Sequence, residues 1–435
     1  MGWLLTLLGM DRRDFLRFAG VGLTLPVAGS LLSACGGDDT ATASASASST
    51  TAGTASASTE PGTTVKKEIR KVKIGFIALT DCASVIMAKE LGYFAERSLD
   101  VTIEKQASWP VVRDNLVNGQ IDASHCLYSM PFSLATIGNQ PDNPLRVAMM
   151  LNRNGQAITL NAKDFEGVGY GDLAAFKAKL DAKSEKLAMT YPGGTHDLWL
   201  RYVLKAAKYE PKADQVIPIP PAQMVANMTA GAMSGFCVGE PWNAKAVTDG
   251  AGFTFITTQD IWQDHPEKAL VVGQRLTTDQ DTLADVMAAI LKASKWIDVP
   301  ENRKKAAQTI AAEAYVNTPA ANIEGRLTGK YDLGAKLGSK DFEGRQMQFF
   351  QDGLVNAPRH SHGIWALAQY QRHGLIKTAP DYTKLAEKFI LRDLYDKVAK
   401  AEGIAIPNDD MTPFKVQLDN VTFDPNKPAV EAARP

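Results

Sequence analysis

The chain has 435 residues, of which 22% are charged and 45% are hydrophobic. This composition excludes wholesale disorder, collagen and a coiled coil, and it is sufficient for two or three lobes with buried cores. The 47 Lys and Arg residues balance 48 Asp and Glu residues, so we expect a small-molecule partner and no nucleic acid. The four cysteines form no Cys-x-x-Cys motif and no Cys/His cluster, which argues against a thiolate metal site, and we expect no cofactor.

The N-terminal segment has the pattern of an export signal. Arg12-Arg13 precedes an uncharged run from Phe18 to Leu32, which is too short and too rich in Gly and Pro for a membrane span. The run ends in Leu32-Ser33-Ala34-Cys35, which resembles a bacterial lipobox. We therefore expect residues 1–34 to be a Tat-type lipoprotein signal peptide and Cys35 to carry the lipid; the alternative is a buried helix followed by an ordinary core cysteine.

A low-complexity stretch follows the lipobox. Residues Thr40 to Thr59 are only Ala, Ser, Thr and Gly. Such a segment has too little apolar surface to bury, so burial cannot offset the conformational entropy that the segment would lose on folding. We therefore expect residues 35–66 to be a flexible tether. A second methionine, Met10, lies just before Arg12-Arg13. It is an alternative translation start, in which case residues 1–9 would not belong to the protein.

The body of the chain alternates strand and helix patterns. Val72, Ile74 and Phe76 alternate with polar or small residues, as in a strand. Further strands are expected near 99–103, 121–127 and 145–151, with helices at 83–97, 111–117 and 132–137. A second series has strands near 187–191, 216–219, 235–238 and 253–257. Such alternation predicts an α/β fold of two lobes with mostly parallel sheets.

The pattern becomes helical beyond residue 277. Helices are expected at 283–296, 301–314, 363–373 and 382–402, followed by an irregular segment over 403–435. We assign 67–155 with 260–380 to a discontinuous first lobe and 156–259 to a second lobe. Residues 381–435 are expected to form a C-terminal helix and tail.

Two loops at predicted strand ends suit ligand binding, because α/β sheets bind ligands beyond the carboxyl ends of their strands. Pro192-Gly193-Gly194-Thr195-His196 leads into a helix, where glycines and free N–H groups favour an anion. His196 is equally consistent with a surface cap. Gly239-Glu240-Pro241-Trp242-Asn243 also leads into a helix; Glu240 there either orients a donor or simply occupies a favourable first turn.

Three further side chains add hydrogen-bond donors. Trp109 starts a helix after a strand and either supplies an indole N–H or fills the core. Gln156 and Lys268 lie near the two expected crossings between the lobes, although a lysine is usually solvated. An indole, an amide, an imidazole and an ammonium together are suited to a planar oxyanion.

Several longer strings resemble a known family. Pro-Pro-Ala-Gln-Met-Val-Ala-Asn-Met at 220–228, Gly-Phe-Cys-Val-Gly-Glu-Pro-Trp-Asn at 235–243 and His-Pro-Glu-Lys at 265–268 are similar to strings in the substrate-binding lipoproteins of nitrate, nitrite and bicarbonate ABC importers. The resemblance covers about Lys71 to Leu394. It implies a periplasmic-binding-protein-like clamp of two α/β lobes closing on one small anion, with the helical C-terminal part packed outside.

The resemblance also implies a set of site residues. Carried over by motif, the residues around the anion are Trp109, Gln156, His196, Gly239, Glu240 and Lys268. His196 and Lys268 match the nitrate branch, whereas the bicarbonate branch has less cationic residues and a bound calcium. We therefore expect nitrate or nitrite as the ligand and no metal. Ser124-His125-Cys126-Leu127-Tyr128 departs from the family's pattern and leaves that edge of the pocket undefined.

The expected function is transport. No nucleophile, base and orienting acid share a motif, so we expect no enzyme activity. The resemblance implies a protein on the periplasmic side of the cell membrane, held there by its lipid, that delivers nitrate to the permease subunits of an ABC importer.

Several alternatives stay open. A calcium-assisted bicarbonate-binding member, or an importer component for a sulfonate or a thiamine precursor, would use the same scaffold. A nitrate sensor would also use it, although the signal and Cys35 argue against a cytoplasmic one. An exported redox enzyme is a further alternative, although this sequence lacks the metal-thiolate and dinucleotide motifs that such an enzyme needs.

Overall fold

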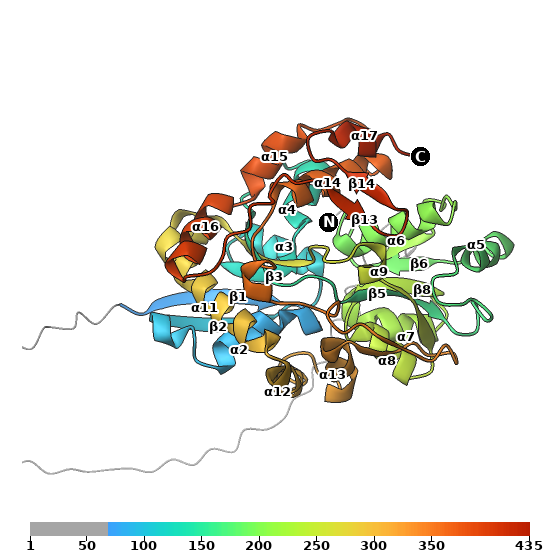
Figure 1. The fold of residues 1–435 in the computed structure, drawn as a ribbon, viewed down its shortest axis with the longest axis horizontal. Coiled ribbons are helices and arrows are strands. Elements are labelled where there is room, and N and C mark those ends of the chain that lie inside the picture. Colours follow the sequence, from blue (N-terminus) through green and yellow to red (C-terminus); the bar gives the residue numbers. More distant parts are fainter. Residues whose placement is uncertain (1–67) are drawn as a thin grey trace, which may run out of the picture. The chain divides into compact units, whose positions relative to one another are not determined.

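Two five-stranded sheets organise the part of the chain that the computed structural model describes, residues 68–435 (Figure 1). The predicted signal peptide, Cys35 and the tether to residue 66 lie outside the described residues. The first sheet has the order β2-β1-β3-β10-β4. Its strands are β1 (Arg70–Phe76), β2 (Leu99–Lys105), β3 (Ala123–Leu127), β4 (Arg146–Met150) and β10 (Lys268–Val272).

The second sheet has the order β7-β6-β8-β5-β9. Its strands are β5 (Gln156–Asn161), β6 (Leu187–Met189), β7 (Val216–Pro218), β8 (Gly235–Gly239) and β9 (Gly252–Thr257). We call the first sheet with its helices the first lobe and the second sheet with its helices the second lobe.

The two-lobed α/β architecture agrees with the prediction: in each sheet four of the five strands share one direction, and the fifth runs against them and makes the sheet mixed. β1 runs parallel to β2 and β3, and β6 runs parallel to β7 and β8. β10 is antiparallel to β3 and β4, and β5 is antiparallel to β8 and β9. The mixed pairing arises because the chain crosses between the sheets just before β5 and β10, and both strands enter their sheets against their neighbours.

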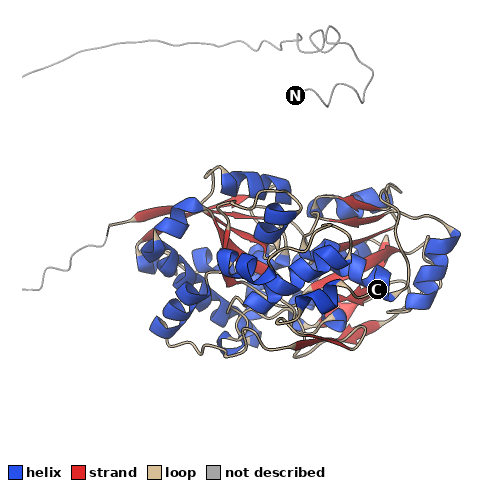
Figure 2. Cartoon of the chain, turned by 90° about the horizontal axis from the view of Figure 1, so that it is seen from above, coloured by secondary structure: helices blue, strands red, loops and turns tan. Residues whose placement is uncertain are grey.

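The helices that connect these strands cover the faces of the sheets (Figure 2). They are η1 (Thr80–Cys82), α2 (Ala83–Glu90), η2 (Ala95–Arg97), α3 (Trp109–Val117), α4 (Met130–Thr136), α5 (Leu173–Ala182), α6 (Thr195–Ala206), η3 (Pro221–Gln223), α7 (Met224–Thr229), α8 (Trp242–Thr248) and α9 (Thr258–Ile261). η1 follows β1, α3 follows β2 and α6 follows β6, so each begins at a strand's carboxyl end. The helix predicted over 83–97 is interrupted by turns after Glu90.

The later helices complete the fold. They are α10 (Gln274–Thr278), α11 (Gln280–Asp298), α12 (Pro300–Ile310), α13 (Ala320–Thr328), η4 (Gln351–Gly353), α14 (His360–Arg372), α15 (Tyr382–Phe389), α16 (Arg392–Ala401) and α17 (Pro428–Ala432). Two short hairpins are formed by β11 (Lys330–Asp332) with β12 (Ser339–Asp341), and by β13 (Phe414–Val416) with β14 (Val421–Phe423). Among the helices from residue 68 onward, none combines the length and apolar character that crossing a membrane requires.

The C-terminal part does not pack only on the outside. Trp365 on α14 is fully buried, and its ring lies 5.3 Å from that of Trp199 on α6 and 5.1 Å from that of Trp262. Tyr370 on the same helix donates hydrogen bonds to the carbonyl groups of Ser129 and Gly193. α14 therefore contacts both lobes, because its aromatic residues join the core.

Two other C-terminal expectations need correction. The helix predicted over 382–402 is broken at Ile390, which is extended and pairs with Val147 beside β4. This pairing with the first sheet overrides the local helical pattern. The segment 403–435, expected to be irregular, contains the β13–β14 hairpin and α17.

Candidate functional site

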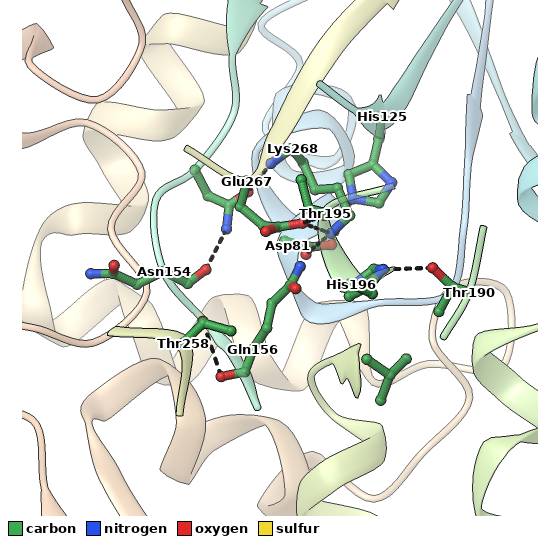
Figure 3. A network of polar contacts seen from close by, with 12 residues as sticks. Asp81, His125, Asn154, Gln156, Thr190, Thr195, His196, Thr258, Glu267 and Lys268 are labelled. Carbon is green, nitrogen blue, oxygen red and sulfur yellow. Dashed lines mark hydrogen bonds and ion pairs between the residues drawn. The ribbon is translucent and has the colours of Figure 1, made fainter. Parts of the chain in front are cut away.

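A buried lysine lies where strand ends from the first lobe meet the second lobe. Lys268 begins β10, and its side chain is fully buried. Its Nζ lies 2.9 Å from Asp81 Oδ2 and 2.7 Å from Glu267 Oε1 (Figure 3). Burial alone would lower the pKa of Lys268, but the two carboxylates raise it above its ordinary value. The ammonium is therefore charged at any ordinary pH.

Asp81 connects this lysine to a buried histidine. His125 on β3 is held through Nε2, which lies 2.6 Å from Asp81 Oδ1. Burial would raise the pKa of Asp81, but the charges and hydrogen bonds of Lys268 and His125 lower it well below its ordinary value. Asp81 is therefore ionised, and it lies between two potential positive charges.

Glu267 is the second carboxylate beside the ammonium, and hydrogen-bond donors surround it. It accepts from the Thr195 hydroxyl at 2.6 Å and from the Trp199 indole at 3.4 Å, in addition to Lys268. Its two oxygens therefore face donors from Thr195, Trp199 and Lys268. Because Thr195 begins α6 of the second lobe, Glu267 also ties the two lobes together at this point.

Three of the predicted donors have buried polar atoms that lack a protein hydrogen-bond partner. Trp109, Gln156 and His196 are all fully buried. Within residues 68–435, Trp109 Nε1, both side-chain polar atoms of Gln156 and His196 Nε2 have no protein hydrogen-bond partner. Buried polar groups without partners are rare in folded proteins. They are explained here if a ligand supplies the partners.

These donors share the surroundings of Lys268. The Lys268 ammonium lies 5.8 Å from the centroid of the Trp109 ring. Figure 3 shows the side chain of Gln156 pointing toward Lys268 and Asp81, with His196 beside it. The structure therefore brings Trp109, Gln156, His196 and Lys268 together from four separate elements.

His196 is a neutral group at this site. Its Nδ1 lies 2.5 Å from the Thr190 hydroxyl. Burial, and then the nearby positive charge of Lys268, lower the pKa of His196 well below its ordinary value. The resemblance groups His196 with Lys268 as cationic residues, but here His196 is neutral: when Nδ1 accepts from Thr190, Nε2 carries a proton and acts as a neutral donor.

Gly239 is placed by the second sheet. It pairs with Gln156 across β8 and β5. A Cβ at this position would lie 3.2 Å from Leu79 Cδ2 and 3.4 Å from Asp81 Oδ2. Gly239 therefore allows the second lobe to approach the Asp81 segment of the first lobe closely.

Glu240 has different neighbours from the other predicted residues. Its carboxylate accepts from the Ala244 backbone N–H at 3.1 Å, and it lies 3.4 Å from Arg326 Nε. Burial raises the pKa of Glu240, although Arg326 opposes this shift. Its backbone carbonyl accepts from the Thr80 N–H at 2.7 Å. The side chain thus interacts with α8 and α13, and its backbone joins the second lobe to η1.

Three titratable members of the cluster, Asp81, His125 and Glu267, were not predicted from the sequence. Glu267 lies within the His-Pro-Glu-Lys string and His125 within the stretch that departs from the family's pattern, so both had a signal. Asp81 had none, because Thr80-Asp81-Cys82 looks like an ordinary helix start. Its role depends on the position of β10, which lies almost 190 residues later and antiparallel to β3.

The arrangement bears on the calcium alternative. In the described part of the chain, no group of three or more His, Cys, Asp and Glu side chains is placed to hold a metal ion. The two carboxylates nearest to the donors already share the Lys268 ammonium. The site is therefore chemically suited to a small anion that accepts hydrogen bonds from several sides.

Comparisons with known proteins agree with this chemistry. The NMT1-like family model matches residues 65–311. The nitrate/nitrite binding protein NrtA of Nostoc sp. is 38% identical, over 96% of this chain and 97% of its own. The crystal structure of the periplasmic nitrate-binding protein NrtA from Synechocystis PCC 6803 has a TM-score of 0.78 and 34% identity, over 84% of this chain and 98% of that one. The bicarbonate-binding protein CmpA of Synechococcus sp. is 27% identical, over 83% of this chain and 85% of its own.

Proposed function

The chain belongs to the NMT1-like family, and on this premise we propose that it captures nitrate or nitrite between its two lobes and delivers the anion to an ABC importer. The observation that carries the proposal is the set of buried donors around Lys268. Trp109 Nε1, the Gln156 amide and His196 Nε2 have no partner among the described residues. A planar oxyanion has acceptor oxygens in several directions, and it would satisfy such donors together.

Nitrate or nitrite is favoured over bicarbonate for two reasons. The relatives named for nitrate and nitrite binding are 37–38% identical to this chain, against 27% for the bicarbonate-binding protein. Lys268 places its ammonium between Asp81 and Glu267, which leaves a calcium ion without free carboxylates at this point.

The location is part of the proposal. The NrtA relative of known structure is described as periplasmic, and we assign this chain to the same compartment. We further propose that residues 1–34 are a Tat-type signal and that Cys35 carries a lipid anchor. The division into a first lobe of residues 67–155 and 260–380 and a second lobe of residues 156–259 is also part of this proposal.

Transport by binding, without catalysis, is consistent with the relatives. The NrtA proteins are named as binding proteins, and a relative of this chain is named as the nitrate import ATP-binding protein NrtC. The chain's own partner would then be the permease of a nitrate importer. The buried cluster has the role of a selective anion receptor.

Calorimetric titration of the purified protein tests the proposal. Nitrate, nitrite, bicarbonate and taurine are each titrated, with and without calcium. We expect saturable binding of nitrate or nitrite that calcium does not change. Calcium-dependent binding of bicarbonate, with no heat from nitrate or nitrite, would replace the proposed ligand by the alternative one.

A further inference from the structure

The buried cluster has an excess of negative charge before any anion binds. Asp81, Glu267 and Lys268 are all fully buried. At formal charges, Asp81 and Glu267 contribute two negative charges, and among residues 68–435 Lys268 contributes the one positive charge in contact with both. With neutral histidines, these three side chains have a net formal charge of minus one. This excess is unexpected in a site proposed to receive a second negative charge.

A bound anion would make the imbalance worse. Burying an ion without a compensating charge costs several kcal/mol in proteins, even after local relaxation. Lys268 cannot fully compensate a bound nitrate, because its ammonium already contacts two carboxylates. A proton taken up together with the anion would keep the net charge of the cluster unchanged.

Two histidines of the cluster are candidates to take this proton, and their surroundings differ. His125 Nε2 lies 2.6 Å from the Asp81 carboxylate, which would stabilise an imidazolium directly. Its other nitrogen, Nδ1, has no partner among residues 68–435. His196 has a neutral hydroxyl as its partner, that of Thr190. The carboxylate contact favours His125.

The charged groups around His125 come from two elements. Asp81 reaches it from η1, and Lys268 and Glu267 act on it from β10 and the residue before it. α3 contributes the Trp109 ring, whose centroid lies 5.9 Å from that of His125. The neighbouring Cys126 is a buried thiol whose pKa is raised by burial, so it stays neutral. His265, a third buried histidine, lies 3.8 Å from Glu267 and is bonded at both ring nitrogens.

We infer that the site binds its anion together with one proton, and that His125, held by Asp81, is the group that takes up this proton. The inference rests on the proposed function and specifies how that function depends on pH. Anion binding would convert the Asp81–His125 contact into an ion pair. The protein would then capture the anion and a proton in a single step.

The direction of the pH effect follows from the two states of His125. Before the anion binds, burial lowers the pKa of His125 below its ordinary value, and the Asp81 charge opposes this only in part. A nearby bound anion raises the pKa again. Between these two pKa values, binding takes up a proton, and affinity increases as pH falls. With one linked proton, the dissociation constant changes by up to about tenfold per pH unit.

Calorimetry on the full-length protein tests the inference directly. Sodium nitrate is titrated near neutral pH in pairs of buffers that differ in ionisation enthalpy. We expect the observed enthalpy to depend on the buffer with a slope of about one proton taken up per nitrate. Nitrate binding without proton uptake between about pH 6 and pH 8 would overturn the inference and leave the proposed function intact. No binding of nitrate or of nitrite at any pH would instead overturn the proposed function itself.

Three variants identify the proton acceptor. His125→Gln keeps an amide donor near Asp81 and is expected to lose the proton uptake, with affinity that is then flat over this pH range. His196→Gln is expected to weaken binding but to keep the uptake. His360→Gln is the matched control, because His360 Nδ1 also lies 2.6 Å from a carboxylate, that of Asp410, in a part-buried pair. It should change neither quantity.

A second readout covers the case in which His125→Gln does not fold. Nuclear magnetic resonance of imidazole nitrogens in the wild-type protein, labelled at histidine, shows which ring becomes doubly protonated when nitrate is added. The inference predicts one such ring, whose signal is changed by Asp81→Asn. Protonation of His196 or His265 in place of His125 would overturn it.

Discussion

Asp81 and Lys268 form a fully buried ion pair, with 2.9 Å between Oδ2 and Nζ, although the two residues lie in different strand-end segments of the first lobe. This pair fixes the ammonium on one side of the buried donors. It also means that Lys268 is more than a cation for the ligand, because it compensates Asp81 and Glu267 in the folded protein. Substitutions at Lys268 should therefore affect both folding and binding.

Replacing Lys268 by Ala is expected to do both. It leaves two buried carboxylates without their positive partner, a kind of change that destabilises proteins by about 3–5 kcal/mol. Nitrate binding should weaken by about 2–5 kcal/mol, since the anion also loses its charged partner. Chemical denaturation and calorimetric titration measure the two effects separately.

A surface ion pair is the matched control for this change. Lys292 lies 2.5 Å from Glu96, and about half of each side chain is exposed. Lys292→Ala should change stability by less than about 1 kcal/mol and leave nitrate affinity unaltered. Equal effects of the two substitutions would contradict the role assigned to Lys268.

The neutral donors can be tested one atom at a time. Trp109→Phe keeps an aromatic ring in the core and removes the indole N–H, and Gln156→Ala removes the amide. Losing a hydrogen bond to a charged group costs about 1.5–3 kcal/mol, so each change should weaken nitrate binding by roughly 10- to 150-fold. Titration calorimetry gives the affinities, and thermal unfolding gives the stability of each variant.

Trp365→Phe is the control for Trp109→Phe. Both indole N–H groups are buried without a partner in the described part of the chain, but Trp365 belongs to the aromatic cluster of α14. Its substitution should leave nitrate affinity within about twofold, a difference of less than 1 kcal/mol. If Trp109→Phe also kept wild-type nitrate affinity, Trp109 would have only a structural role and would not donate a hydrogen bond to the anion.

Local patterns predicted most strands, because alternation and flanking turns are properties of short segments. They did not predict the break at Ile390, where pairing with Val147 decides the backbone, or β5, whose Gln156–Asn161 run follows β4 after a short crossing. The α14 contacts with both lobes also depend on residues far apart in the chain.

The same division applies to the candidate site. Trp109, Gln156, His196 and Lys268 were predicted because family strings and strand-end loops contain or adjoin them. Asp81 was not, since a single aspartate after a strand has no signature, and its importance comes from contacts with His125 and Lys268 in space. The charge balance of the site therefore became visible only in three dimensions.

Gly239→Ala tests the close approach between the lobes. The backbone of Gly239 is in a region open to alanine, so the effect comes from the added methyl group, which meets Leu79 at 3.2 Å and Asp81 at 3.4 Å. Overpacking of this kind costs about 1–3 kcal/mol. We expect weaker nitrate binding with a folded protein, as judged by titration and by circular dichroism.

Gly169→Ala provides a comparison in which the new methyl group has room. The nearest atom there is Asp172 Cβ at 3.9 Å, an ordinary contact distance. Nitrate affinity should not change in this variant. Unchanged affinity in Gly239→Ala too would show that the two lobes do not need this contact to hold the anion.

Cys35→Ser tests the proposed anchor. Without a thiol, the lipid cannot be attached, and the protein should move from the membrane fraction to the soluble fraction of the cells that express it. Nitrate affinity should be unaltered, because the site residues lie between Asp81 and Lys268. Ala34→Gly, which leaves the cysteine in place, is the control. Retention of Cys35→Ser in the membrane fraction would contradict lipidation at this residue.

The stability of the protein without nitrate should decrease as pH falls from about 7 to 5.5. Burial lowers the pKa of five of the chain's six histidines in the folded protein: His125, His196, His265, His362 and His373. In this range the unfolded chain therefore binds more protons than the folded chain, so acidification favours unfolding. Each histidine contributes at most about 1.4 kcal/mol per pH unit.

Thermal unfolding at a series of pH values measures this slope, with and without saturating nitrate. Asp197 and Glu240, whose pKa values are raised by burial, act in the opposite sense nearer to the ordinary carboxyl pKa of about 4, which is why the range stops at about pH 5.5. With nitrate bound, the change of the unfolding free energy with pH should be smaller by about the contribution of one histidine, because the bound anion favours protonated His125. Parallel curves with and without nitrate would contradict the coupling, since proton uptake on binding requires the stabilisation by nitrate to increase as pH falls.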